Sequence, residues 1–170
     1  MSRFTGPHPL EKSHDFLAFD CGKEPLNSFL IRHALANQSN GSARTFVGLD
    51  ENRVVGYYSL AVSSVLYDDA PDRMAKGLAR HPIPILLMAR FAVDVAYQGQ
   101  GIGKGLFKDA LKRCLTVARA AGVRAVMTHA KDEDAKALYL KFGMTECPSN
   151  PLHLYLLMKD VERLLVNPNE

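Results

Sequence analysis

A nearly continuous apolar run over residues 85–95 predicts a strand that is buried on both faces. After residue 105 the apolar positions change to a spacing of three and four, which predicts an amphipathic helix that Gly122 can end. The apolar face of this helix consists of Leu106, Phe107, Ala110, Leu111, Cys114, Leu115 and Ala118. Between strand and helix lies QGQGIGKG, residues 98–105, in which every second position is glycine.

Before this segment, the pattern predicts a helix followed by a β-hairpin. Pro25 fits the first turn of the helix, and the run SNGS ends it. Its apolar positions are Leu26, Phe29, Leu30 and Ala34. Residues 44–49 and 53–62 are β-rich runs on either side of a short polar turn, which indicates a hairpin. The pattern leaves two stretches open: residues 16–19 are a strand or a turn, and residues 68–81 are a loop or a short helix.

After the long helix, the pattern predicts a strand, a shorter helix and a last strand. Residues 123–130 form the first of these strands and residues 152–158 the second. Asp132 can cap the helix between them, and Gly143 ends it. This order predicts one domain over residues 1–170, an α/β sandwich with a parallel pair of strands at its centre.

Composition narrows the function classes without selecting one. A net charge of +3 does not by itself indicate nucleic-acid binding. Three cysteines without CxxC spacing, Cys21, Cys114 and Cys147, fit reduced thiols in the cytoplasm. The histidines lack HxxxH or HExxH spacing, so no metal site is expected. The first residues, MSRFTGPHPLEK, have no apolar core for a secretory signal, and no run is long enough to cross a membrane.

The glycine-rich loop matches neither common nucleotide-binding motif. A P-loop needs Ser or Thr after Gly-Lys, but Gly105 follows Lys104, and Gln98 stands where its first glycine belongs. A dinucleotide fingerprint fails because its last glycine would fall on Lys104 or Leu106. Glycines that lead into a helix still let backbone N–H groups approach a phosphate. The alternative is a glycine-rich turn that binds nothing.

The sequence Gln98-x-x-Gly101-x-Gly103, which follows ARFAVD at 89–94, resembles the acyl-CoA motif of the GNAT superfamily of N-acetyltransferases. Tyr139 lies in ALYLKFGM, which is similar to the end of that family's motif region, although Met144 stands where Phe is common. The resemblance implies the GNAT fold, in which helices flank a mixed central β-sheet with a splayed parallel pair. It also implies acetyl-CoA as co-substrate, with its pantetheine bonded by Phe91, Ala92 and Val93. Its pyrophosphate would lie on Gln98, Gly99, Gln100, Gly101, Gly103 and Lys104.

Residues 19–47, 76–94 and 150–159 resemble one branch of that family, the GNAT toxins of toxin–antitoxin pairs. This resemblance implies transfer of acetyl to the α-amino group of aminoacyl-tRNA, which blocks translation. It further implies a homodimer and a separately encoded ribbon-helix-helix antitoxin, through which alone the toxin would contact DNA.

Three residues are candidates for proton transfer. The resemblance assigns Tyr139 as the general acid for the leaving thiolate, whereas its helical spacing alone equally fits a core tyrosine. His129 ends a strand and is either a base or a solvated strand-end residue. For Asp94, a structural role in the turn is favoured over base catalysis.

Basic residues provide candidates for contact with tRNA phosphates. They are Arg32, Arg73, Lys76, Arg80 and Arg90. Two other functions stay open: acetylation of a protein N-terminus or small amine, and a binding module that keeps the CoA fold without catalysis. A polyamine substrate would require acidic residues in the acceptor cleft, and the basic residues 73–81 argue against it.

Overall fold

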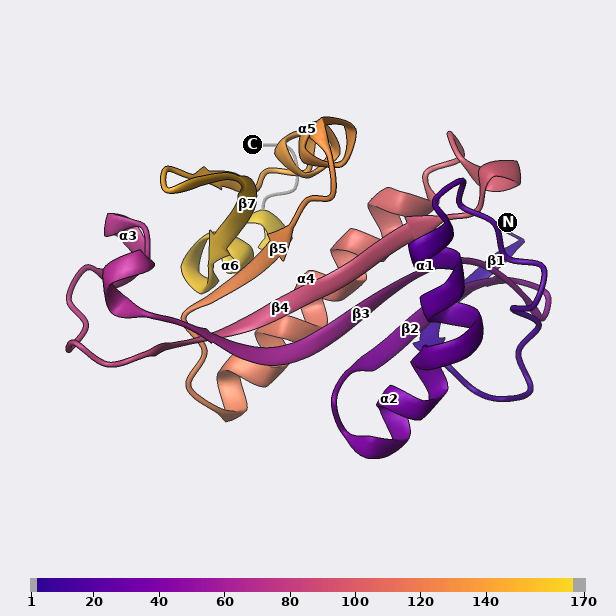
Figure 1. The fold of residues 1–170 in the computed structure, drawn as a ribbon, viewed down its shortest axis with the longest axis horizontal. Helices are drawn as coiled ribbons and strands as arrows, with labels where there is room; N and C mark the ends of the chain where they lie inside the picture. Colours follow the sequence, from indigo (N-terminus) through magenta and orange to yellow (C-terminus); the bar gives the residue numbers. More distant parts are fainter. Residues whose placement is uncertain (1–2, 167–170) are drawn as a thin grey trace. The chain divides into compact units, whose positions relative to one another are not determined.

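The computed structural model describes residues 3–166, and within that range no helix is long and apolar enough to cross a membrane. Its strands are hydrogen-bonded in the order β1-β2-β3-β4-β5-β7-β6 (Figure 1). The strands are β1 (Phe4–Pro9), β2 (Arg44–Asp50), β3 (Arg53–Val65), β4 (Ile83–Val93), β5 (Ala125–His129), β6 (Thr145–Cys147) and β7 (Asn150–Leu157). The α-helices are α1 (Glu24–Ser28), α2 (Ala34–Asn40), α3 (Asp72–Ala75), α4 (Ile102–Ala120), α5 (Glu133–Lys141) and α6 (Met158–Val166).

The described chain divides into two compact units. The first comprises the residues up to Ala61 together with Ala89–Ala110, and the second comprises Val62–Met88 together with the residues from Leu111 onward. Strands β3 and β4 and helix α4 contribute residues to both units. The single domain expected over residues 1–170 stays a prediction.

The first unit contains the predicted hairpin and the predicted N-terminal helix. Strands β2 and β3 pair antiparallel from Arg44–Leu60 to Asp50–Arg53, which confirms the hairpin. The helical segment packs against β2 (Figure 1), and it has a five-residue π-helix, Phe29–His33, between α1 and α2. Gly41 ends α2 at a φ of 80°, in the left-handed region that favours glycine. The buried core is Leu10, Phe16, Phe19, Leu26, Phe29, Leu30, Ala34, Val47, Leu49, Val54, Tyr57 and Ala92.

The second unit contains the predicted parallel pair. Strands β4 and β5 are parallel, in register from Ile85–Ala125 to Leu87–Met127, which confirms this expectation. Strand β7 pairs antiparallel with β5 and with β6, and α5 and α6 pack against β7 (Figure 1). The core of this unit is Met74, Ala75, Ile83, Ile85, Ala125, Met127, Cys147, Tyr155 and Leu157.

The structure corrects the sequence pattern at both ends of the chain. The strand expected at 152–158 is β7, but it is not the last element, because α6 follows it. Strands β1 and β6 were not predicted: β6 has only three residues, and β1 contains glycine and two prolines.

The structure also decides the two stretches that the sequence pattern left open. Residues 16–19 form a turn, closed by a bond of 3.1 Å from Phe19 N to Phe16 O. Residues 68–81 contain the short helix α3 and the end of a 3₁₀ helix, Tyr67–Asp69.

Gly56 lets the first turns of α4 approach β3 within the first unit. A Cβ at this position would lie 2.8 Å from Leu106 Cδ1, 3.2 Å from the Ala92 carbonyl oxygen and 3.2 Å from Ile102 Cγ2. The Ala92 carbonyl is backbone and cannot easily move. The absence of a side chain at Gly56 therefore helps set where α4 begins, directly after the glycine-rich loop.

We predict that Gly56→Ala lowers the free energy of unfolding by about 1–3 kcal/mol, because overpacking displaces α4 from β3. The matched control is Gly48→Ala, at the position paired with Gly56. A Cβ there would have its nearest neighbours at 3.8–4.0 Å, an ordinary packing distance. Chemical denaturation of both variants measures the difference; equal stabilities would contradict the close approach at Gly56.

Candidate active site

The predicted site residues belong to two separate sets. The candidates for acetyl-CoA binding, in the range 91–104, all lie in the first unit. Tyr139 and His129 lie in the second unit. The tRNA candidates are divided, with Arg32 and Arg90 in the first unit and the other three in the second.

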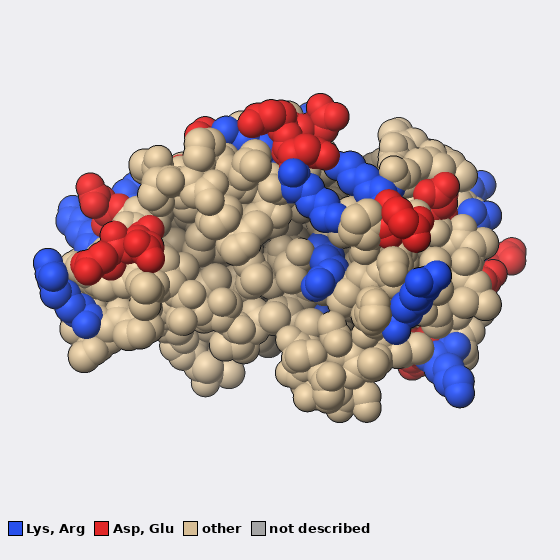
Figure 2. Space-filling model, in the orientation of Figure 1, with Lys and Arg blue, Asp and Glu red and all other residues tan. Residues whose placement is uncertain are grey.

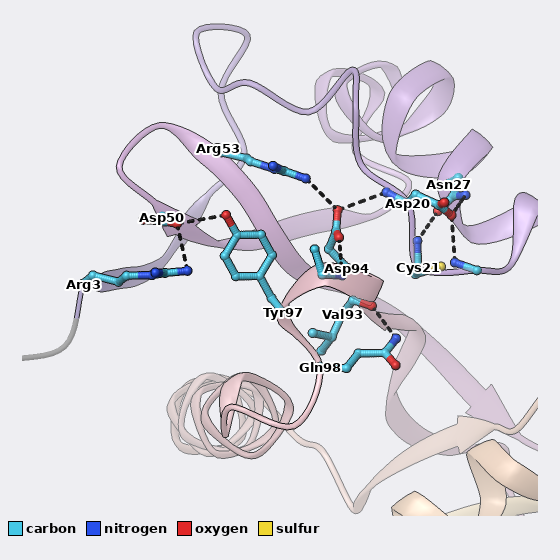
Figure 3. A network of polar contacts seen from close by, with 12 residues as sticks. Arg3, Asp20, Cys21, Asn27, Asp50, Arg53, Val93, Asp94, Tyr97 and Gln98 are labelled. Atoms are coloured by element: carbon cyan, nitrogen blue, oxygen red, sulfur yellow. Dashed lines mark hydrogen bonds and ion pairs between the residues drawn. The ribbon is translucent and has the colours of Figure 1, made fainter.

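The glycine-rich loop begins where β4 ends. Gln98 turns its side chain back onto the strand, and its Nε2 donates a hydrogen bond of 3.0 Å to the Val93 carbonyl (Figure 3). Gly99 and Gly101 then take φ values of 80° and 84°. Residues with a side chain rarely adopt this conformation, so the backbone at these two positions favours glycine. Helix α4 starts at Ile102.

The loop exposes its backbone in the way that an anion requires. A Cβ at Gly99, Gly101 or Gly105 would meet no atom within 4 Å, so a ligand can approach the main chain at all three. The first N–H groups of an α-helix lack intrahelical acceptors and favour negative charge. A cavity of about 220 Å³ borders the loop; it is lined by Phe4, Thr5, Gly6, Pro7, Gly48, Val55, Gln100, Gly101, Ile102, Gly105 and Leu106. These features fit a phosphate group on the loop.

Asp94 fixes the turn between β4 and the loop. Asp94 is 1% exposed, and its side chain caps the 3₁₀ helix Val95–Tyr97, since Oδ1 accepts a bond of 2.9 Å from Ala96 N. Oδ2 accepts bonds of 3.2 Å from Asp20 N and 3.5 Å from Arg53 Nη2 (Figure 3). These contacts support the structural interpretation of Asp94 rather than base catalysis. Sequence reasoning missed Asp20 and Arg53 as its partners.

A second set of polar contacts, made by Tyr97, Asp50 and Arg3, holds the 3₁₀ helix against the hairpin turn. The Tyr97 hydroxyl donates a bond of 2.9 Å to Asp50 Oδ2, and this bond raises the pKa of Tyr97. Arg3 also pairs with Asp50 at 3.4 Å (Figure 3). Arg53 places its guanidinium 5.3 Å from the centre of the Tyr97 ring. The residues just before the loop are therefore anchored on both sides.

Tyr139 is held on α5 in the second unit. The helix begins as predicted, because Asp132 Oδ1 accepts a bond of 2.9 Å from Ala135 N. The Tyr139 side chain is 6% exposed, and burial raises its pKa to about 12. It therefore keeps its proton at neutral pH and is available as an acid.

Sequence reasoning missed Thr128, on β5, as a residue of this part of the site. Burial raises the pKa of Tyr139, and a smaller effect of the Thr128 side chain lowers it. Thr128 is 1% exposed, and its Oγ1 donates a bond of 2.9 Å to the Met88 carbonyl of β4. The available signal was a hydroxyl residue within the buried run of β5, where a polar side chain needs a hydrogen-bond partner.

His129 lies at the exposed end of β5 and stacks on His153 of β7. The ring centres are 3.8 Å apart, and the ring planes differ by 14°. Burial, followed by the charge of His153, lowers the pKa of His129, so the neutral form that can accept a proton is favoured. These contacts are compatible with His129 as a base and with His129 as a solvated strand-end residue.

The basic candidates do not form one uniform positive patch. Arg73 Nη2 pairs with Asp160 at 3.1 Å, and Arg80 lies 3.9 Å from Asp68. Figure 2 accordingly shows blue and red atoms next to each other around α3. Arg90 places its guanidinium 3.7 Å from the centre of the buried Phe29 ring. Lys76 is exposed, and within residues 3–166 no carboxylate forms a salt bridge with it.

Two further features concern metal and thiol chemistry. Among residues 3–166, no group of three or more His, Cys, Asp or Glu side chains is arranged to hold a metal ion. Cys21, Cys114 and Cys147 are all free thiols. Burial raises the pKa of Cys114 to about 12 and that of Cys147 to about 11, so neither has the lowered pKa that marks a reactive nucleophile.

Comparison with known proteins identifies the fold and the enzyme class. Residues 41–146 match the acetyltransferase (GNAT) domain family. The chain is 40% identical over 165 residues to a tRNA-acetylating toxin of Mycobacterium tuberculosis. The aligned region covers 97% of this chain and 99% of that toxin.

Two solved structures of the toxin AtaT are also similar. AtaT complexed with acetyl-methionyl-tRNAfMet has a TM-score of 0.82 and 28% identity, covering 91% of this chain and 94% of AtaT. A tyrosine-to-phenylalanine mutant of AtaT, bound to the C-terminus of the antitoxin AtaR and acetyl-CoA, has a TM-score of 0.80 and 27% identity, covering 96% and 98%. Together with the glycine-rich loop on β4, these matches confirm the resemblance seen in the sequence: the chain belongs to the GNAT family of acetyltransferases.

Proposed function

We propose that this protein is a toxin that transfers acetyl from acetyl-CoA to the α-amino group of aminoacyl-tRNA and so blocks translation. The observation that carries the proposal is the 40% identity, over nearly the whole chain, to a tRNA-acetylating toxin. The acetyl-methionyl-tRNA bound to the similar toxin AtaT supports the same acceptor class.

In this proposal the end of β4 and the glycine-rich loop bind the acetyl donor. Phe91, Ala92 and Val93 bond the pantetheine through their backbone, and residues 98–104 receive the pyrophosphate. The positive φ of Gly99 and Gly101 and the open space above them support this assignment. Lys104 is exposed on the first turn of α4 and adds positive charge for a phosphate.

The reaction is attack of a neutral amine on a thioester. The amine nitrogen bonds to the carbonyl carbon, the oxygen becomes an oxyanion, and collapse of this intermediate breaks the C–S bond. The departing sulfur takes the proton of the Tyr139 hydroxyl, which leaves a phenolate. The nitrogen releases its extra proton to water, and a proton from water restores the Tyr139 phenol. An α-amine next to an ester is less basic than lysine, so a substantial part is already neutral at pH 7, and a strong protein base is not required.

The proposed function implies partners and a location. The antitoxin AtaR bound to the similar toxin supports a separately encoded antitoxin for this chain. We assign it to the ribbon-helix-helix class, and we assign DNA contact to the antitoxin alone. The toxin itself is proposed to act as a homodimer in the cytoplasm, where aminoacyl-tRNA is found.

The proposed function predicts a direct assay result. Purified protein with labelled acetyl-CoA and charged tRNAs should produce N-acetylated aminoacyl-tRNA, detected by mass spectrometry of the aminoacyl group released from the tRNA. A tetrapeptide with a free N-terminus and spermidine serve as competing acceptors. Turnover of those acceptors without any on charged tRNA would replace the proposed function with acetylation of peptides or small amines.

We predict that Tyr139→Phe lowers kcat by about 10²–10⁴-fold, because the thiolate then leaves without a proton donor. The dissociation constant of acetyl-CoA, measured by calorimetry, should stay near the wild-type value, since the loop is unchanged. Tyr58→Phe is the matched control, because it removes another buried tyrosine hydroxyl, one bonded to Asp109. An unchanged kcat in the Tyr139 variant would exclude it as the acid.

We predict that Lys76→Glu combined with Arg80→Glu weakens tRNA binding. The salt dependence of binding should fall by about one unit of slope for each phosphate that the double variant no longer neutralises. Arg73 is left intact because its bond to Asp160 makes any variant there ambiguous. Lys108→Glu combined with Lys112→Glu, on the exposed face of α4, changes the net charge by the same amount and serves as the control. Equal affinities for the double variant and the control would remove this surface from the tRNA site.

A further inference from the structure

The glycine-rich loop has few contacts of its own to fix its shape. A Cβ at Gly99, Gly101 or Gly105 would meet no atom within 4 Å, so no other group packs where these side chains would be. Glycine also loses more conformational entropy than any other residue when it is held in one conformation. The direction of the loop's N–H groups therefore depends on the segments that hold its two ends.

Asp94 bonds both sides of the turn at the first of these ends. Its N–H donates a bond of 2.9 Å to the Val55 carbonyl of β3, and its own carbonyl accepts a bond of 2.9 Å from Tyr97 N. Its Oδ1 accepts the bond of 2.9 Å from Ala96 N. The 3₁₀ helix that these bonds close is followed directly by Gln98, where the loop begins. Asp94 therefore sets the point and the direction in which the backbone enters the loop.

The same carboxylate ties the loop entry to the segment before α1. The bonds run in both directions, since Asp94 Oδ2 accepts 3.2 Å from Asp20 N and Val95 N donates 2.8 Å to the Asp20 carbonyl. Asp20 Oδ1 in turn accepts 3.0 Å from Asn27 Nδ2, on α1 (Figure 3). The loop entry is thus braced against residues 74 positions away within the first unit.

A carboxylate fits this position better than any neutral side chain of the same size. The three groups that bond it are all donors: Ala96 N, Asp20 N and, at 3.5 Å, Arg53 Nη2. A carboxylate has two acceptor oxygens and no proton to donate, whereas an amide would turn its NH₂ group toward one of these donors. Arg53 also offsets the charge of Asp94, which would otherwise oppose an anion on the loop.

We propose that Asp94 is a positioning residue for the acetyl donor: its bonds to Ala96 N and Asp20 N hold the loop so that its backbone N–H groups face the pyrophosphate of acetyl-CoA. The proposal rests on the assignment, made above, of the pyrophosphate to residues 98–104. It does not depend on which amine accepts the acetyl group. Asp94 should accordingly matter most for a donor that carries a pyrophosphate.

The decisive measurement compares two donors in Asp94→Asn. S-acetyl-pantetheine carries the same thioester as acetyl-CoA but no pyrophosphate. The ratio of kcat/KM for acetyl-CoA to kcat/KM for S-acetyl-pantetheine should fall about 10-fold, because a bond to a charged acceptor is lost and the loop is no longer held. The loss should lie in the KM for acetyl-CoA, with kcat at saturation within about twofold of wild type. Calorimetry, which needs no acceptor, should show the dissociation constant of acetyl-CoA raised by about the same factor of 10.

Arg53→Gln is a milder second variant, and Asp160→Asn is the matched control. The Arg53 side chain is 42% exposed, and its loss should lower the same donor ratio about 3-fold. Asp160 is another paired carboxylate with little exposure, 3.1 Å from Arg73 in the second unit. Its variant should leave the donor ratio at the wild-type value.

Equal losses on the two donors in Asp94→Asn would overturn the inference, because Asp94 would then be merely structural. A lower kcat with an unchanged KM for acetyl-CoA would overturn it as well. If Asp94→Asn does not fold, Arg53→Gln decides, and an unchanged donor ratio there counts against the inference.

The donor comparison also separates this inference from the proposed function. A wild-type protein that uses both donors with equal kcat/KM would remove the pyrophosphate from the loop and the inference with it. If the wild-type protein acetylates no charged tRNA, the proposed function fails alone. Calorimetry, and the donor ratio with whichever amine is accepted, then still test Asp94.

Discussion

Backbone carbonyls of β4 that its parallel pairing with β5 leaves without a partner need other hydrogen bonds, and meeting this need shapes the candidate site. The parallel pairing of β4 with β5 ends at Leu87 and Met127. The Met88 carbonyl is met by Thr128, and the Val93 carbonyl by the Gln98 side chain. An unpaired buried carbonyl costs about 1–3 kcal/mol, so the buried bond from Thr128 to the Met88 carbonyl matters to the fold. Gln98, which makes the second of these bonds, is also the first residue of the glycine-rich loop.

Local chemistry is why much of this fold could be predicted from sequence. Pro25 and Asp132 mark helix starts through their own φ restriction and side-chain oxygen, and Gly41 ends a helix because it tolerates a positive φ. The glycine-rich loop could be found for the same reason, since its glycines act through their own backbone. In each case the information lies within a few residues of the feature.

Features that depend on distant residues could not be predicted. Asp94 is fixed by Asp20 and Arg53, which lie 74 and 41 positions away, and no local pattern connects them. The pairing of Arg73 with Asp160, 87 positions away, could not be predicted from the basic residues 73–81 alone. Thr128 belongs to the same class, because the Met88 carbonyl that its hydroxyl bonds lies 40 positions away.

Tyr139 illustrates why such a network matters for the proposed chemistry. Burial raises its pKa to about 12, whereas a thiol titrates near 8.5, so direct transfer to a free thiolate is uphill by about 5 kcal/mol. The buried tyrosine alone is therefore a poor acid, although it is reliably protonated. Transfer becomes feasible where the phenolate is stabilised as it forms and where the amine, acidified by attack on the carbonyl, can return a proton. A hydrogen-bond donor that reaches the phenolate as it forms meets the first requirement.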